Sequence, residues 1–150
     1  MEQIINWKTF ERNLQKDKVY LNIAEQIGSL SHCKRKQVGC IIVKDDNIIS
    51  TGFNETPKNM DNSCESTEDG ETLWYVLHSE SNAITKLSKS TLSSEDSTMY
   101  ITLSPCKQCA KLILQSGIKR IVYNKIHSCT DGIDFLSNQG VECTYVQPQI

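Results

Sequence analysis

The chain lacks long apolar runs, a strong excess of charge of either sign, and internal repeats. No apolar stretch approaches the roughly 18 residues of a membrane-spanning helix, so we expect none. Residues 1–10 contain Glu2 and no apolar core of the kind that signal peptides have, so we expect no export signal. With 16 Lys and Arg against 18 Asp and Glu, the net charge is −2. No overall basic field is therefore available to attract a long nucleic acid.

The chain is an ordinary globular sequence in size and composition. Its 150 residues are enough for one full hydrophobic core, so we expect a single domain over residues 1–150. It has seven cysteines. Without an export signal, these are expected to be reduced thiols in a cytosol-like compartment.

Two short motifs together carry the ligands for a zinc ion. The first is His78-Ser79-Glu80 and the second is Pro105-Cys106-Lys107-Gln108-Cys109. One imidazole and two thiolates leave the fourth tetrahedral position of zinc open, which distinguishes a catalytic zinc site from a structural one. H-x-E combined with P-C-x-x-C is the signature of zinc-dependent nucleobase deaminases.

The spacing within the motifs suggests different roles for their residues. Cys106 and Cys109 are three residues apart, so on a helix they share one face and can hold one ion. His78 and Glu80 are two residues apart and do not face the same way. We therefore expect Glu80 beside the metal, where its carboxylate can transfer protons, rather than as a ligand.

The helix that carries the cysteine pair is expected to begin at Ser104 and Pro105. Serine is a good N-cap and proline is accepted in the first helical turn. The thiolates would then lie at the helix N-terminus, where the helix dipole favours them.

A lone C-x-x-C motif is also typical of a zinc ribbon or of two core cysteines. A ribbon needs a second C-x-x-C or paired histidines. The other cysteines provide neither: Cys33, Cys40, Cys64, Cys129 and Cys143. A zinc-stabilised module without chemistry remains the alternative, and Glu80 argues against it because a structural site has no use for this acid.

Apolar periodicity predicts alternating helices and strands. We expect helices over residues 8–31, 79–89, 106–116 and 132–138, and strands over 38–43, 48–51, 99–103, 118–123 and 141–146. Residues 55–72 are polar and irregular, which is typical of a loop over a site. This order predicts an α/β sandwich around one sheet, with both metal-binding motifs at helix N-termini facing one cleft.

The chain resembles the deoxycytidylate (dCMP) deaminases, especially their compact phage and bacterial forms, from Ser31 to Val146. The resemblance rests on Cys33–Gly39, Gly52–Pro57, His78–Ile84, Leu103–Cys106, Cys109–Ile113 and Ser116–Tyr123. The zinc motifs are common to the whole cytidine deaminase superfamily, whereas the other segments favour the dCMP branch. The resemblance implies a three-layer α/β/α cytidine deaminase-like fold with a five-stranded mixed sheet.

It also implies an activity, the zinc-dependent hydrolysis of dCMP to dUMP and ammonia, which supplies dUMP for thymidylate synthesis. Zinc held by His78, Cys106 and Cys109 would make a water molecule nucleophilic near neutral pH, so that it attacks C4 of the cytosine ring. Glu80 would take the proton of this water and deliver it to N3. The alternatives within the fold are an enzyme that also accepts dCTP, and a deaminase of free cytidine, tRNA adenosine or another heterocycle.

Three contacts to the nucleoside are implied by the resemblance. The backbone N–H of Ser79 is expected to bind the pyrimidine O2, and the backbone carbonyl of Ser104 to accept from the amino group. Asn54 is expected to contact the sugar hydroxyl. Its alternative role is that of a turn former after a strand.

The densest cationic cluster, Lys34-Arg35-Lys36, is the expected phosphate site. Arg35 is the first choice because a guanidinium suits bidentate phosphate recognition, and Lys36 is its expected neighbour at the site. Cations at this position can also simply favour the C-terminus of the preceding helix.

The resemblance further implies a homo-oligomer, a hexamer. Because no export signal is found, we expect it in the cytoplasm, or in the host cytoplasm if the chain is viral. It is expected to bind a small-molecule nucleotide and neither long nucleic acid nor membrane. Activation by dCTP and inhibition by dTTP, with Mg²⁺ at a separate site, are the implied regulation. A second, structural zinc is considered at Cys33 and Cys64, although two further ligands are not evident in the sequence.

Overall fold

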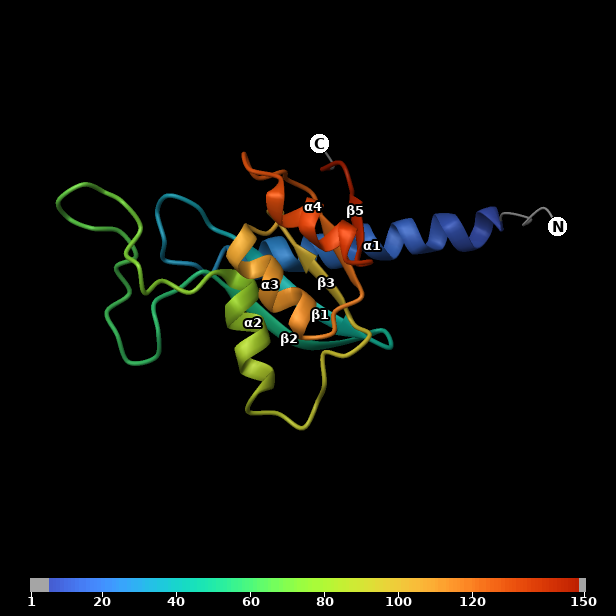
Figure 1. The fold of residues 1–150 in the computed structure, drawn as a ribbon, viewed down its shortest axis with the longest axis horizontal. Coiled ribbons are helices and arrows are strands. Elements are labelled where there is room, and N and C mark those ends of the chain that lie inside the picture. Colours follow the sequence, from blue (N-terminus) through green and yellow to red (C-terminus); the bar gives the residue numbers. More distant parts are fainter. Residues whose placement is uncertain (1–5, 149–150) are drawn as a thin grey trace.

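The computed structural model describes residues 6–148, and its elements follow the predicted order (Figure 1). The helices are α1 Trp7–Gly28, α2 Ser79–Leu87, α3 Lys107–Gln115 and α4 Asp131–Asn138. The strands are β1 Gly39–Lys44, β2 Asn47–Phe53, β3 Thr98–Ile101, β4 Arg120–Tyr123 and β5 Glu142–Tyr145. Residues 1–10 were expected to carry no export signal, and residues 1–5 of that segment lie outside the described residues. Within residues 6–148, no helix has the length and apolar character needed to cross a membrane.

The five strands form one mixed sheet in the order β2-β1-β3-β4-β5. β1 is antiparallel to both β2 and β3, whereas β3, β4 and β5 are parallel. β1 and β2 form a hairpin, and both residues of its turn, Asp45 and Asp46, have positive φ angles of 50° and 62°. Such left-handed pairs are typical of tight hairpin turns that follow the twist of the sheet. The expected five-stranded mixed sheet is confirmed.

Helices cover both faces of the sheet, with α2, α3 and α4 on one face and α1 on the other (Figure 1). Strand residues alternate between the two sides. Cys40 and Ile42 of β1 pack with the α2–α4 layer, while Ile41 and Val43 pack with α1. The result is the predicted three-layer α/β/α sandwich with an apolar core on each side of the sheet.

One edge of the sheet gathers the segments that carry the motifs. The register pairs Gly39 with Phe53, so the start of β1 lies beside the end of β2. It also pairs Ile101 with Tyr123, so β3 and β4 end side by side. Because β1 runs antiparallel to β3, the loops after β2, β3 and β4 and the segment before β1 meet at this edge. A ligand site at the carboxyl ends of parallel strands is the usual arrangement in open α/β sheets.

Gly52 allows the first turn of α2 to approach this edge. A Cβ atom at Gly52 would collide with the carbonyl oxygen of Ser79 and with Ala83. The backbone of α2 therefore lies directly against β2, which places His78 at the end of the strands. A larger residue at this position would move the helix start away from the sheet.

A long irregular segment connects β2 to α2 and extends away from the sheet, on the left of Figure 1. It is held by a disulfide between Cys33 and Cys64, whose Cα atoms are 5.2 Å apart. The expectation that all the cysteines are reduced is therefore wrong for this pair, and their sulfurs are not free to bind a second zinc. Short bridges at Glu55–Leu77 and Glu65–Thr72 add order to the segment.

Candidate active site

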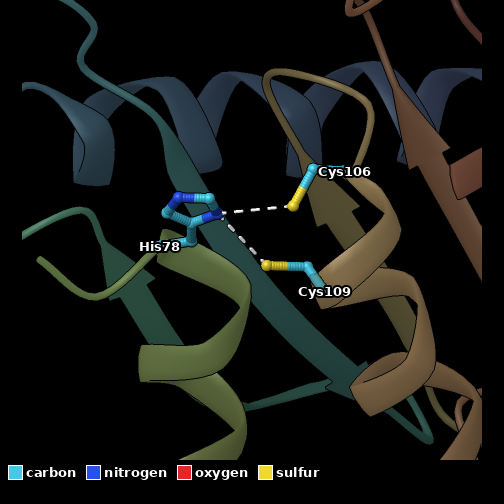
Figure 2. A group of neighbouring side chains, drawn as sticks. All are labelled: His78, Cys106 and Cys109. Atoms are coloured by element: carbon cyan, nitrogen blue, oxygen red, sulfur yellow. Dashed lines mark hydrogen bonds between the residues drawn. The ribbon is translucent and has the colours of Figure 1, made fainter. Parts of the chain in front are cut away.

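His78, Cys106 and Cys109 lie together at the edge where the strands end (Figure 2). Their ligand atoms all lie within 4.8 Å of one another. The Nδ1 atom of His78 is 3.6 Å from Sγ of Cys106 and 3.3 Å from Sγ of Cys109. Two segments that are far apart in the sequence thus present one nitrogen and two sulfur atoms to the same point.

The local backbone explains how the three side chains converge. His78 is the N-cap of α2 and Cys106 is the N-cap of α3, both with extended backbone, and Cys109 lies in the first turn of α3. The expectation that Ser104 caps α3 and that Pro105 lies in its first turn is wrong. The hydroxyl oxygen of Ser104 instead accepts the backbone N–H of His127 at 2.8 Å. Its side chain therefore faces the loop after β4 rather than the helix.

The three donor atoms fit a zinc ion in chemistry and in spacing. Tetrahedral zinc, with bonds of about 2.0 Å to nitrogen and about 2.3 Å to sulfur, separates such ligands by roughly 3.5 Å. The nitrogen–sulfur distances of 3.6 and 3.3 Å agree with that separation. Three protein ligands leave one position for a further ligand, as in catalytic zinc sites.

Hydrogen bonds within the cluster favour the thiolate form of Cys106 even without a metal ion. Contacts from Cys109 and then from His78 lower the pKa of Cys106 to about 3. The hydrogen bond with Cys106 raises the pKa of the Cys109 thiol. The hydrogen bond between Cys106 and His78 likewise raises the pKa of the His78 imidazole. Cys106 is thus the anionic member, and zinc binding would displace the remaining protons because its ligands are thiolate and neutral imidazole.

Glu80 lies in the first turn of α2 and is only 4% exposed. Burial raises the pKa of its carboxyl group, and the hydrogen bond from Ser79 opposes that rise. Ser79 is fully buried, and its hydroxyl donates to the carboxylate oxygen Oε1. A desolvated carboxyl group whose pKa is shifted toward neutral is the kind of group that can accept and return a proton.

A cavity of about 210 Å³ opens beside the cluster. Its lining combines two members of the metal cluster and the carboxylate with polar and apolar groups from the surrounding loops. The residues are Cys33, Arg35, Lys36, Val38, Asn54, Glu65, Thr72, Val76, His78, Ser79, Glu80, Leu103, Ser104, Cys106 and His127. Every substrate-contact residue expected from the sequence therefore borders this one cavity.

The side-chain amide of Asn54 is hydrogen-bonded to the backbone of residues 36–38, which border the cavity. Its Oδ1 accepts the backbone N–H of Val38 at 2.9 Å, and its Nδ2 donates to the carbonyl of Lys36 at 2.7 Å. The next residue, Glu55, points toward α2, where its carboxylate accepts from Asn82. One N–H of the Asn54 amide has no part in these bonds and is available to a ligand.

The cationic cluster before β1 is partly engaged with acidic residues of the long segment. The guanidinium of Arg35 pairs with Glu71 at 2.8 Å, and both side chains are largely exposed. One carboxylate oxygen of Glu65 accepts the backbone N–H groups of Lys34 and Arg35, at 2.7 and 3.0 Å. Lys36 forms no ion pair among the described residues.

His127 also borders the cavity, at a position whose role the resemblance to the family leaves open. It follows β4, whose carboxyl end lies beside that of β3. That position is the signal that could have identified it, since residues after adjacent parallel strands converge at one edge. Thr72 and Val76 also border the cavity, but they belong to the irregular segment, where no periodic pattern predicts which side chains face inward.

Residues 14–125 match the model of a known family, described as the cytidine and deoxycytidylate deaminase zinc-binding region. The deoxycytidylate deaminase of Enterobacteria phage T4 is 32% identical over 164 residues, covering 81% of this chain and 85% of the relative. The Saccharomyces cerevisiae deoxycytidylate deaminase is 29% identical, covering 83% of this chain. This chain spans only 43% of the yeast protein's length.

A solved structure has the same fold. It is that of a dCMP deaminase from the cyanophage S-TIM5 in complex with dCMP and dUMP, 41% identical to this chain, with a TM-score of 0.85. The similarity covers 88% of this chain and 97% of the cyanophage protein. The expected cytidine deaminase-like fold is thereby confirmed.

Proposed function

The chain belongs to the cytidine and deoxycytidylate deaminase family, and on that basis we propose that it hydrolyses dCMP to dUMP and ammonia. The observation that carries the proposal is the convergence of His78, Cys106 and Cys109 beside the buried carboxyl group of Glu80, at a cavity that cations also border. The activity is proposed for the single domain that residues 1–150 are expected to form.

His78, Cys106 and Cys109 are the proposed zinc ligands. A zinc ion held by them would supply the Lewis acidity that makes a water molecule nucleophilic near neutral pH. Glu80 is proposed to take one proton from the attacking water as the water oxygen bonds to C4 of the cytosine ring, and to deliver that proton to N3. It would then take the proton of the new C4 hydroxyl and give it to the amino group, so that the C4–N bond breaks, ammonia leaves, and the oxygen remains on C4 as the carbonyl of uracil.

The main chain at the two helix starts orients the base. The backbone N–H of Ser79 is proposed to donate to the pyrimidine O2, and the carbonyl of Ser104 to accept from the amino group. The free amide N–H of Asn54 is proposed to bind the sugar hydroxyl. Fixed donors and acceptors of this kind need no reorganisation during the reaction.

Lys36 and Arg35 are the proposed phosphate contacts. Lys36 borders the cavity and has no acidic partner among residues 6–148. Arg35 would have to exchange its exposed pair with Glu71 for the phosphate. That exchange has a small energetic cost, because an exposed ion pair contributes about 0–1 kcal/mol.

Ultraviolet-monitored deamination by the purified, zinc-loaded protein tests the proposal, with dCMP, deoxycytidine and dCTP as substrates. Turnover of dCMP well above that of deoxycytidine supports it. Turnover of dCTP at a comparable rate would make the protein a dual-substrate enzyme. No turnover of any of the three would overturn the proposal and move the substrate to another heterocycle.

The same assay, with dCTP or dTTP and Mg²⁺ added, tests the regulation that we propose by analogy with the family. Activation by dCTP and inhibition by dTTP are the expected effects. Light scattering of the same sample tests the proposed hexamer. We also propose that the enzyme supplies dUMP for thymidylate synthesis and that it is cytoplasmic, and imaging of a tagged copy would test the location.

A further inference from the structure

We infer that the Cys33–Cys64 disulfide is a redox switch for nucleotide affinity, because its reduction releases the long segment between β2 and α2 from the wall of the cavity. The inference rests on the proposed function and on the proposed cytoplasmic location. It adds a regulatory signal to that function, the thiol–disulfide balance around the protein.

The disulfide is built into the wall of the cavity. Cys33 borders the cavity and directly precedes the cationic segment 34–36, two members of which border it as well. Cys64 directly precedes Glu65, which borders the same cavity. The S–S bond therefore joins the two sections of chain that form this wall, one before β1 and the other in the long segment.

The disulfide is the strongest connection between these two sections. Among residues 6–148, the polar side-chain contacts that also join them come from two glutamates of the long segment. Glu65 accepts the backbone N–H groups of Lys34 and Arg35, and Glu71 forms an exposed ion pair with Arg35. Exposed ion pairs contribute little to stability, whereas a disulfide with a sequence separation of 31 residues removes much of the freedom of the chain between its ends.

Reduction breaks the S–S bond and adds two electrons and two protons. A thiol reductant such as glutathione attacks one sulfur as its thiolate and forms a mixed disulfide with the protein. A second glutathione thiolate then attacks the glutathione sulfur of that bond, which leaves two protein thiols and one oxidised glutathione. Disulfides are rare in the cytosol, and those that occur there are usually transient and redox-sensing. The proposed location thus favours a reversible bond.

A nucleotide in the cavity and the disulfide stabilise each other. Cys33 and Cys64 are 4% and 1% exposed, so a reductant reaches them through the cavity or after the long segment opens. A bound nucleotide opposes both routes. At equilibrium the coupling is reciprocal, so tighter binding to the oxidised form means that the nucleotide lowers the reduction potential of the disulfide. A tenfold difference in affinity corresponds to about 30 mV for this two-electron couple.

Zinc-loaded protein equilibrated in glutathione buffers of increasing reducing strength tests the inference. The readouts are KM and kcat for dCMP, the calorimetric Kd for dUMP, the zinc content, and the fraction of disulfide remaining, measured by alkylation and mass spectrometry. The double substitution Cys33→Ser and Cys64→Ser provides a permanently open form. Cys143→Ser, which removes a thiol of β5 and keeps the disulfide, is the matched control.

We expect reduction to raise KM for dCMP and Kd for dUMP by roughly tenfold, within the usual range of coupling between two sites, and reoxidation to restore both. Saturating dUMP should lower the midpoint potential of the disulfide by about 30 mV, the equivalent of that tenfold difference. The doubly substituted protein should bind dUMP as weakly as the reduced wild type and should not respond to glutathione. Cys143→Ser should respond as the wild type does.

Three results would overturn the inference. One is an equal Kd for dUMP in the oxidised and reduced protein. Another is a disulfide that stays intact in buffers as reducing as the cytosol, since it would then be a permanent staple. The third is a glutathione response of the doubly substituted protein, because the effect would then lie elsewhere, for example at Cys106 and Cys109.

The proposed function and the redox inference fail in different ways. Absence of dCMP turnover in every buffer would reject the deaminase activity, whereas dUMP binding and its effect on the midpoint potential would still decide the role of the disulfide. Turnover of dCMP that does not depend on the state of the disulfide would reject the redox inference alone. Absence of dUMP binding to the oxidised wild type would reject both.

Discussion

Ser79 donates its hydroxyl hydrogen to the Glu80 carboxylate across 2.7 Å, and both residues are buried. The bond fixes one oxygen of the Glu80 carboxylate, which borders the cavity together with His78, while the backbone N–H of Ser79 is at the start of α2. One residue can therefore orient the proposed proton-transfer group with its side chain and the proposed substrate with its main chain.

The first prediction concerns Glu80. Glu80→Gln keeps the size and the buried position but removes the group that accepts a proton, so deamination should fall by about a hundredfold to ten-thousandfold. Zinc content by atomic absorption and the circular dichroism spectrum should match the wild type. Glu68→Gln, at an exposed position of the long segment, is the matched control and should retain full activity. Full activity of Glu80→Gln would reject the proposed mechanism.

The second prediction concerns the proposed metal ligands. Cys106→Ser and Cys109→Ser should each lose bound zinc and activity, because a hydroxyl is a much poorer zinc ligand than a thiolate. Cys143→Ser replaces a half-buried cysteine of β5 and should keep both. A chelator should inactivate the wild type, and added zinc should restore it. Retention of one equivalent of zinc by either ligand variant would contradict the assignment.

The third prediction concerns the Cys33–Cys64 disulfide, which closes a loop with a sequence separation of 31 residues. Cys64→Ser should lower the free energy of unfolding in urea by about 2–4 kcal/mol. It should also raise KM for dCMP, since the disulfide ties the segment that contains Lys36 to the long loop. Thiol titration of the unfolded, metal-free wild type should detect five of the seven cysteines. Detection of all seven would contradict the disulfide.

The fourth prediction concerns a buried ion pair far from the cavity. Asp17 on α1 accepts two hydrogen bonds from Arg120 on β4, at 2.9 and 2.7 Å, and a third from the Tyr100 hydroxyl. Asp17→Ala would leave the Arg120 guanidinium without its partner, so the free energy of unfolding should fall by about 3–5 kcal/mol.

An exposed ion pair on the same helix provides the control for this prediction. Lys16 pairs with Asp46, and both side chains are largely accessible. Lys16→Ala should therefore change the free energy of unfolding by no more than about 1 kcal/mol. At 25 °C both variants should retain the wild-type kcat, because neither residue borders the cavity. Equal destabilisation by the two substitutions would show that burial adds nothing to the Asp17–Arg120 pair.

Much of the fold could be predicted because its signals are local. Runs such as 38–43 and 118–123 are apolar over the length of a buried strand, and Gly117, with a positive φ of 80°, follows the C-cap of α3 near the predicted end of the helix at residue 116. The start of α3 was harder to predict. The hydroxyl of Ser104 accepts a hydrogen bond from the backbone N–H of His127 in the loop after β4, and these two residues are 23 positions apart.

The amino-acid sequence by itself determined the element order and indicated the residues that we propose as zinc ligands, since periodicity and ligand spacing are properties of neighbouring residues. The tertiary structure alone decided the Cys33–Cys64 disulfide, the pairing of Arg35 with Glu71 and the inward position of His127. Each of these depends on where an irregular loop lies relative to a distant segment. Such positions are set by packing and hydrogen bonds across the fold, and no local pattern encodes them.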